Sequence, residues 1–373
     1  YRMAEPGESI DYEIQLPSDH RTGTFWYHPH AHELVASQVS GGLAGAIVVG
    51  GGADDAQLSS TTERVLVLTN PKVGTTSAVL SATHAEQQNG REGDVLLVNG
   101  QLEPVLEAKR GDVEHWRIIN ATPSLYLKLE ATGLTPSLIG GDQGRLAKPV
   151  GISEVLIAPG QRVELLVPVM RSGKATLTAT SMSRGTMTHG SSGSGSMGGM
   201  DMGSMGNMGR GSSAMAVADP VPILTLSARP GTSTPMLPST VNPSVPPAPS
   251  SVQRRRSIML GAMAMGDGEF VIDGASFDPA RIDLEADLES TEEWVLINGS
   301  MMDHPFHLHT WPFYVVGSSA GGQEPGWADT VWVPVGSRVT IRVPFRTFSG
   351  TTVYHCHVLD HEDLGMMGQI RVS

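Results

Sequence analysis

Near its C-terminus the chain reads His355-Cys356-His357-Val358-Leu359-Asp360-His361-Glu362-Asp363-Leu364-Gly365-Met366, and this run holds its only cysteine. Successive side chains of a strand point to opposite faces of a sheet, so Cys356 is expected to face one way and both flanking histidines the other. A thiolate is a ligand for soft metal ions, and imidazole binds copper generally. The triplet therefore predicts a strand that holds one copper through sulfur and two more through the imidazoles.

The residues after the triplet extend the sulfur site. His361 and Met366 follow Cys356 by five and ten residues, which is the spacing of a loop that folds back around one metal. A blue-copper site needs two histidines, one cysteine and a weakly bound axial methionine. The run supplies all of these except one histidine, which must come from elsewhere in the chain.

A second cluster, His304-Pro305-Phe306-His307-Leu308-His309, supplies that histidine. On an extended chain His307 and His309 share a face and His304 points to the other. This division matches the triplet, with one ligand for the sulfur site and two for a neighbouring site. A third cluster, His28-Pro29-His30, adds another same-face pair. The isolated histidines are predicted to be ordinary surface or core residues: His20, His84 and His115.

Composition indicates an all-β protein and excludes several classes. Charged residues make up only 17% of the chain, while 44 glycines and 25 prolines provide many turns. A net charge of −13 disfavours binding to nucleic acid phosphates and to anionic membranes. A single cysteine excludes a disulfide within the chain. Because no apolar run reaches about 18 residues, no membrane span is expected.

Short apolar runs separated by turn residues divide the chain into blocks. Residues 11–16 alternate in polarity and predict a strand, as do 24–30 and 45–49, all within a first block at 1–52. Further runs predict one complete β-sandwich over 60–230 and another over 257–373. A Gly/Ser/Met-rich insert at 182–216 interrupts the middle block, and a Pro/Ser/Thr-rich linker at 231–256 follows it.

These motifs resemble those of the multicopper oxidase family, in particular its bacterial laccase-like and cuprous oxidases. The matching segments are 23–30, 42–45, 304–309 and 355–367, with further similarity at 99–100, 117–120 and 156–162. The resemblance implies three cupredoxin-like Greek-key β-sandwich domains: an incomplete first domain at 1–52, a copper-free second domain at 60–230 and a third domain at 257–373 with the type 1 copper. It also implies a monomeric protein of the periplasm or the extracellular space.

Position by position, the resemblance assigns ligands for four coppers. The type 1 ligands are His304, Cys356, His361 and, axially, Met366. The type 2 ligand is His307. The type 3 ligands are His28, His30, His309, His355 and His357. The family's oxygen site uses eight histidines and the chain offers six of them. We therefore expect the chain to be truncated after an earlier His-x-His motif of the first domain.

The implied reaction is one-electron oxidation of a phenolic substrate or Cu(I), coupled to four-electron reduction of dioxygen to water. Glu362, next to His361, resembles the family's acidic residue that relays protons to the oxygen site. The alternative is a solvated carboxylate near the end of a loop. The axial thioether of Met366 predicts a low to moderate reduction potential.

The Met-rich insert has two interpretations. Thioethers are soft ligands suited to Cu(I), which predicts a substrate site from which Met302 passes electrons to the type 1 copper. The methionines of this predicted site are Met302, Met197, Met200, Met202, Met205 and Met208. Alternatively, the insert is a flexible loop whose methionines have no role.

A copper-binding or copper-resistance protein with little oxidase activity is the main alternative function. The Met-rich insert and the two absent histidines favour it. Copper nitrite reductase also has a blue site of Cys, two His and Met. It does not need histidines on both sides of the cysteine together with two further His-x-His pairs, so the triplet argues against that enzyme.

Overall fold

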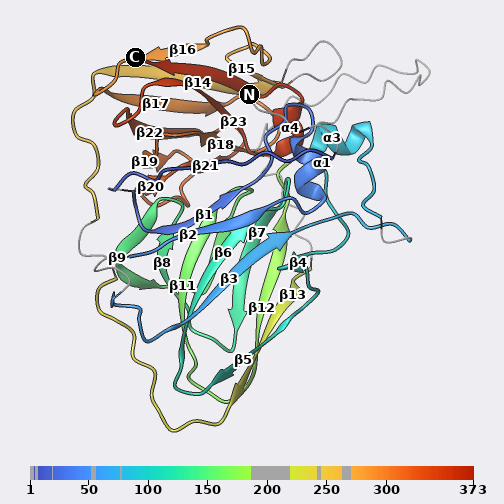
Figure 1. Cartoon of the computed structure of the whole chain (residues 1–373), viewed down its shortest axis with the longest axis vertical. Helices are drawn as coiled ribbons and strands as arrows, with labels where there is room; N and C mark the ends of the chain where they lie inside the picture. The colour runs from blue at the N-terminus through green and yellow to red at the C-terminus, as the bar shows by residue number, and fades with distance from the viewer. Residues whose placement is uncertain are drawn as a thin grey trace, which may run out of the picture.

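The computed structural model describes residue 4 and residues 7–18, 20–51, 56–75, 78–185, 219–241, 245–262 and 270–373. In this part of the chain two β-sandwiches lie one above the other, with a two-stranded ribbon between them (Figure 1). The protein is all-β, as its composition predicts. None of the described helices is long and apolar enough to cross a bilayer.

The ribbon pairs β1 (Gly23–Tyr27) with β2 (Gly45–Val49), and α1 (Val35–Ser40) lies between them in sequence. Because β1 ends at Tyr27, His28 and His30 follow the strand and do not continue it as predicted. The prediction of a strand at 11–16 is wrong. No described segment pairs with it, and Tyr12 and Ile14 are 66% and 73% exposed. Alternating polarity produces a strand only where a partner accepts the backbone hydrogen bonds.

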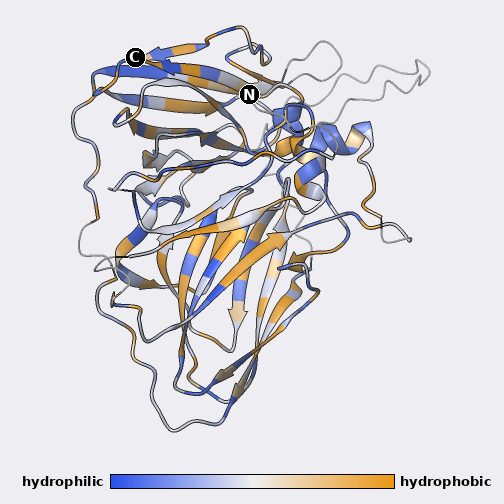
Figure 2. Cartoon of the chain, in the orientation of Figure 1, coloured by the Kyte–Doolittle hydropathy of each residue, from blue (hydrophilic) through white to orange (hydrophobic). Residues whose placement is uncertain are grey.

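The middle sandwich packs a six-stranded sheet against a five-stranded one. In spatial order the first sheet contains β4 (Leu97–Val98), β3 (Thr62–Thr69), β6 (Val113–Asn120), β11 (Arg162–Pro168), β8 (Ser137–Gly141) and β9 (Gly144–Gly151). The second contains β10 (Glu154–Ile157), β7 (Tyr126–Thr132), β12 (Gly173–Met182), β13 (Val221–Arg229) and β5 (Val105–Lys109). Apolar residues recur along these strands (Figure 2) and bury Trp116 completely. The connection after β3 contains α3 (His84–Asn89), which Thr83 caps.

The C-terminal sandwich has the same two-sheet plan. Its six-stranded sheet contains β15 (Phe270–Ile272), β14 (Arg254–Ala262), β17 (Thr291–Asn298), β22 (Arg338–Pro344), β19 (Phe313–Ser318) and β20 (Gly326–Ala328). Its five-stranded sheet contains β16 (Leu284–Ala286), β24 (Met367–Val372), β23 (Gly350–Cys356), β18 (His304–Leu308) and β21 (Thr330–Val333). Between β23 and β24 lies α4 (Leu359–Asp363). Apart from β14, the strands fall inside the blocks expected from sequence, while the domain bounds themselves stay a prediction.

The predicted linker extends too far at its C-terminal end. β14 begins at Arg254, within the run of arginines that the sequence assigned to the linker. β14 runs parallel to β17, and the side chain of Arg256 forms an ion pair with Glu292 there. The middle sandwich repeats this arrangement, since Arg64 on β3 pairs with Glu114 on the parallel strand β6. The arginine run is therefore part of a strand that its acidic neighbours stabilise.

A buried charge cluster joins the ribbon to the middle sandwich. The Glu164 carboxylate accepts hydrogen bonds from Thr24 Oγ1 of β1 at 2.7 Å and from Arg117 Nη1 at 2.6 Å, and lies 3.0 Å from His115 Nε2. His115 is thus a buried core residue with an acidic partner. Burial alone would raise the pKa of Glu164, but His115 and Arg117 outweigh burial and lower it to about 2.

We expect Glu164→Gln to destabilise the protein by up to about 3 kcal/mol at neutral pH. Because the folded pKa lies below the ordinary value of 4.5, the carboxylate stabilises the fold above that pH, and this contribution is lost as pH falls towards 2. Urea unfolding of parent and variant across this range should therefore converge at the acidic end. Glu63→Gln is the matched control, because Glu63 also contacts Arg117 but is half-exposed. If the parent and Glu164→Gln differed by the same free energy of unfolding at every pH, the prediction would be contradicted.

Candidate metal centre

Three buried side chains converge around the single cysteine. β18 and β23 are antiparallel neighbours, and the pairing of Phe306 with Cys356 places Cys356 on the same face as His304. Cys356 Sγ lies 3.4 Å from His304 Nδ1 and 3.8 Å from His361 Nδ1, which comes from α4. All three side chains are fully buried, and their donor atoms lie within 4.8 Å of one another.

The loop after Cys356 folds back as its spacing predicts. The Met366 N–H donates to the carbonyl of His361 at 2.8 Å, and the Cys356 N–H donates to the carbonyl of Met366 at 3.0 Å. Met366 is completely buried in the same core. Phe270 stacks on His361 with ring centroids 3.9 Å apart, which fixes the plane of that imidazole. The loop therefore packs Met366 into the core that surrounds the cysteine and orients the imidazole of His361 beside it.

The donor set and its spacing fit a copper ion. Metal–sulfur and metal–nitrogen distances of about 2.3 and 2.0 Å, as found at zinc, put the two donor atoms about 3.5 Å apart at a near-tetrahedral angle. The Sγ–Nδ1 distances of 3.4 and 3.8 Å bracket this value. Burial lowers the pKa of His304 to about 3, so its imidazole is neutral and free to act as a ligand. One thiolate, two imidazoles and a methionine are the ligands of a blue-copper site.

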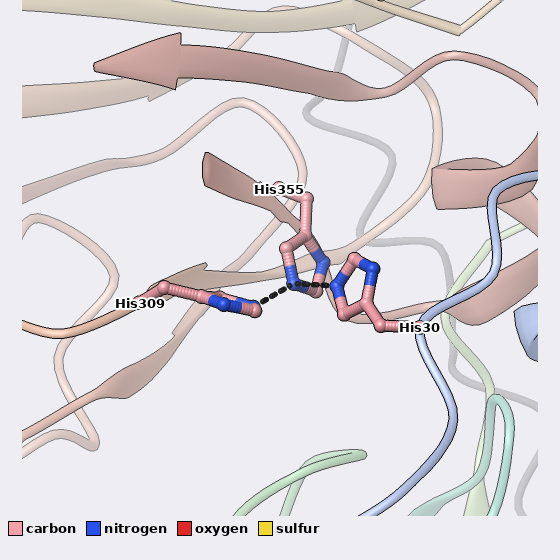
Figure 3. Close-up of side chains that lie close together, drawn as sticks. All are labelled: His30, His309 and His355. Atoms are coloured by element: carbon pink, nitrogen blue, oxygen red, sulfur yellow. Dashed lines mark hydrogen bonds between the residues drawn. The ribbon is translucent and has the colours of Figure 1, made fainter. Parts of the chain in front are cut away.

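A second cluster consists of histidines only. His30, which follows β1, lies against His309 after β18 and His355 on β23 (Figure 3). The Nε2 atom of His355 is 3.4 Å from His30 Nε2 and 3.1 Å from His309 Nε2. Two nitrogens bound to one ion at about 2.0 Å would lie about 3.3 Å apart. The three nitrogens therefore have the spacing of ligands to a single metal.

The remaining three histidines line an adjoining cavity of about 270 Å³. The ring of His357 lies 5.7 Å from that of His28 and 5.5 Å from that of His307, while Trp26 stacks on His28 at 4.5 Å. His307 Nδ1 donates to the carbonyl of Asp329 at 2.8 Å, which leaves its Nε2 free to bind a metal. The structure thus brings all six predicted histidines together around one space.

Glu362 on α4 lies at the edge of the histidine cluster. Its Oε2 is 3.0 Å from His355 Nδ1 and its Oε1 is 3.4 Å from His30 Nε2. His355 Nδ1 also lies 2.9 Å from the carbonyl of Cys356, so its proton is shared between the two acceptors. Burial would raise the pKa of Glu362, but His355 and His30 outweigh it and lower the pKa to about 2. Glu362 is fully buried, which contradicts the alternative of a solvated carboxylate.

The acidic residues beside Glu362 attach α4 to the rest of the molecule. Asp360 forms an ion pair with Arg91 of the middle sandwich, with Nη2–Oδ1 at 2.7 Å. Asp363 accepts hydrogen bonds from the N–H groups of Val35 and Ala36 in α1 at 3.1 and 2.9 Å. Each of the three carboxylates of α4 therefore has a different partner, and only Glu362 faces the histidines.

The predicted Cu(I) methionines are only partly placed. Five of them lie outside the described residues: Met197, Met200, Met202, Met205 and Met208. Met302 is completely buried, and its backbone pairs with Gly185 at the start of the insert. The neighbouring Met301, which the sequence did not single out, is 53% exposed. The insert therefore leaves the middle sandwich beside the residues that precede His304.

Sequence reasoning missed the side chains that support the histidines from behind. Arg162 of the middle sandwich forms two hydrogen bonds with the carboxylate of Asp329, at 2.8 and 2.6 Å. The carbonyl of Asp329 in turn holds His307. Arg162 lies in the segment 156–162 that resembles the family, but nothing in that segment indicates a partner 167 residues away.

Comparisons with known proteins agree with this geometry. Two family models described as multicopper oxidase match residues 1–54 and 244–373. The chain is 27% identical to a multicopper oxidase of Staphylococcus aureus, over the whole chain and 72% of the relative, and 28% identical to the cell division protein FtsP of Dickeya dadantii, over 99% of the chain and 74% of the relative. A multicopper oxidase of Campylobacter jejuni, described as a metallo-oxidase, superposes with a TM-score of 0.79 at 28% identity, covering 96% of this chain and 73% of the other. McoA, a multicopper oxidase of Aquifex aeolicus, superposes with a TM-score of 0.78 at 23% identity, covering 95% of this chain and 76% of the other.

Greek-key sandwiches that carry a buried Cys-His-His-Met cluster define a copper protein of the cupredoxin class. In this chain that cluster is joined, through the two neighbours of its cysteine, to a group of six histidines. The chain belongs to the multicopper oxidase family. Copper is therefore its cofactor, and the family supports an oxidoreductase.

Proposed function

We propose that this protein is a laccase-like oxidase that takes single electrons from a phenolic substrate or from Cu(I) and reduces dioxygen to water. The observation that supports it most is the path His355-Cys356-His357. Cys356 faces the sulfur-containing cluster, while His355 and His357 face the histidine clusters. Three adjacent residues at the end of β23 thus join an electron-accepting site to an oxygen-reducing one.

The proposed ligands follow from this arrangement. His304, Cys356, His361 and Met366 would hold the type 1 copper, and His307 the type 2 copper. The type 3 pair would be held by His30, His309 and His355 on one side and by His28 and His357 on the other. Bound copper would supply one-electron transfer at the first site and multi-electron dioxygen chemistry at the second. Burial lowers the pKa of these imidazoles except that of His355, whose pKa Glu362 raises against burial, and it excludes water from the cysteine.

Glu362 is proposed to deliver protons to the dioxygen site. Its two oxygens lie against His30 and His355, which belong to the same metal cluster. We expect Glu362→Gln, which keeps the shape and removes the ionisable group, to lower the dioxygen-limited turnover by about 10²-fold. Reduction of the type 1 copper by substrate, followed by stopped-flow absorbance without dioxygen, should be unchanged. Asp363→Asn is the matched control, because Asp363 caps α1 and does not face the histidines. Equal losses in the two variants would refute the role of Glu362.

Both a phenol and Cu(I) are compatible with the type 1 site, and deletion of the Met-rich insert distinguishes between them. The insert starts beside Met302 and Met301, next to His304. If the insert supplies Cu(I), deletion of residues 186–214 should slow Cu(I) oxidation while oxidation of a small phenol stays within about twofold. Oxygen uptake with each reductant, together with copper content per chain, measures this. Unchanged Cu(I) kinetics would remove the insert from the mechanism.

The same measurement tests the proposed function as a whole. Four coppers per chain with oxygen uptake support the oxidase. One blue copper without oxygen uptake supports the alternative, a copper-binding or copper-resistance protein.

The monomeric state and the location in the periplasm or outside the cell stay predictions. Size-exclusion chromatography with light scattering and fractionation of the native host test them.

A further inference from the structure

The imidazole of His304 has a hydrogen-bond partner on the side away from the cysteine. Its Nδ1 faces Cys356 Sγ at 3.4 Å, and its Nε2 lies 2.7 Å from Ser300 Oγ. If Nδ1 binds a metal, the ring proton is on Nε2 and is donated to the serine hydroxyl. His304 itself is completely buried, whereas Ser300 is half-buried and the adjacent Met301 is exposed. Ser300 therefore lies between the proposed type 1 copper and the surface.

Ser300 belongs to a tight turn that follows β17. Its N–H and its hydroxyl lie 3.0 and 2.9 Å from Asn298 Oδ1, and the N–H of Met302 donates to its Oγ at 3.2 Å. Asn298 Nδ2 donates to the carbonyl of Met302 at 2.8 Å and to that of Val333 at 2.9 Å. These bonds fix the hydroxyl relative to the strand that carries His304.

A related turn, one residue longer, follows β6 in the middle sandwich. The N–H and hydroxyl of Thr122 donate to Asn120 Oδ1 at 3.2 and 2.7 Å, and the N–H of Leu125 donates to Thr122 Oγ1 at 3.1 Å. Asn120 Nδ2 donates to the carbonyls of Leu125 and Ile157 at 2.8 and 3.1 Å. Both turns therefore place a hydroxyl two residues after an asparagine that binds it, and Ser300 adds a contact with the imidazole of His304.

We propose that Ser300 is a positioning residue that orients His304 and sets the reduction potential of the type 1 copper. The inference rests on the proposed type 1 site. A hydrogen-bond acceptor on the outer nitrogen raises the basicity of a ligating imidazole and favours the more highly charged metal ion.

The test is a redox titration of the blue absorption in four proteins: the parent, Ser300→Ala, Ser300→Thr and Thr122→Ala. Without the acceptor, Ser300→Ala should shift the Cu(II)/Cu(I) equilibrium about tenfold towards Cu(I), which is about 59 mV for one electron. Ser300→Thr should stay close to the parent, because threonine keeps the hydroxyl that lies against His304 Nε2. Thr122→Ala removes the equivalent turn hydroxyl and should leave the potential unchanged while it lowers thermal stability.

An unchanged potential and blue spectrum in Ser300→Ala would overturn the proposal and reduce Ser300 to a turn residue. If Ser300→Ala does not fold, Ser300→Asp provides the opposite shift, towards Cu(II), and an unchanged potential there would also overturn it. Failure of the proposed function looks different. A parent that binds blue copper but consumes no dioxygen refutes the oxidase and leaves this titration valid, whereas a parent without blue copper refutes the type 1 site and the role of Ser300 with it.

Discussion

Replacing Cys356 with serine is expected to abolish the blue absorption and to reduce oxygen uptake to background. The side chain is fully buried, with the two imidazoles of His304 and His361 around its sulfur. Serine keeps the shape but offers a hard, neutral hydroxyl in place of a soft thiolate. Copper content should fall by one ion per chain, because the histidine cluster does not contain the cysteine. Absorption spectra and metal analysis of the purified variant measure both effects.

The matched control is Met366→Leu, which removes the weak axial ligand and keeps the three strong ones. It should retain the blue colour, because the three strong ligands remain. Its reduction potential should rise, because the weak stabilisation of Cu(II) by the thioether is lost. A blue Cys356→Ser protein would contradict the assignment of the sulfur ligand. Loss of all copper in Cys356→Ser would contradict the prediction that the histidine cluster binds its copper without the cysteine.

Replacing Arg162 with methionine is expected to lower the free energy of unfolding by about 3–5 kcal/mol. All five N–H groups of the guanidinium are used. They donate to the carbonyls of Thr24, Gly160 and Asp142 at 3.2, 2.9 and 2.8 Å and to both carboxylate oxygens of Asp329. The acceptors belong to the ribbon, the middle sandwich and the C-terminal sandwich. Methionine leaves the buried Asp329 carboxylate without its cation, and denaturant titration measures the cost.

The same variant should also weaken the copper at His307, because the carbonyl of Asp329 holds that imidazole at 2.8 Å. A loss of about 10–100-fold in affinity is the usual effect of removing such support. The type 2 signal in electron paramagnetic resonance should fall while the blue absorption stays. Arg184→Met is the control: Arg184 is equally buried but contacts Asn89, Gly90 and Ser124, away from His307. Equal loss of type 2 copper in both variants would show that global destabilisation, not His307, is responsible.

Local periodicity predicted most of the strands and failed where a partner decides the outcome. The apolar runs near Trp116 and Trp294 lie on strands, because each buries its alternate side chains in a sandwich core. Residues 11–16 have equal alternation but no described partner, and Tyr12 stays exposed. The run Arg254-Arg255-Arg256 is strongly polar, yet its strand forms because β17 offers Glu292 and Glu293 beside it. These cases differ in whether a neighbouring strand is available for pairing, and not in the strand propensity of their residues.

The sequence by itself predicted which residues would hold copper and which face of the strand each one takes. Cys356 and its two neighbours point to opposite sides because extended backbone alternates, and His304 and His307 divide in the same way for the same reason. Only the tertiary structure decided the partners. His30 meets His355 across 325 residues, Glu362 lies between these two imidazoles, and Arg162 braces His307 through Asp329. Spacing along the chain fixes local direction, whereas contacts between distant segments depend on how the sandwiches pack.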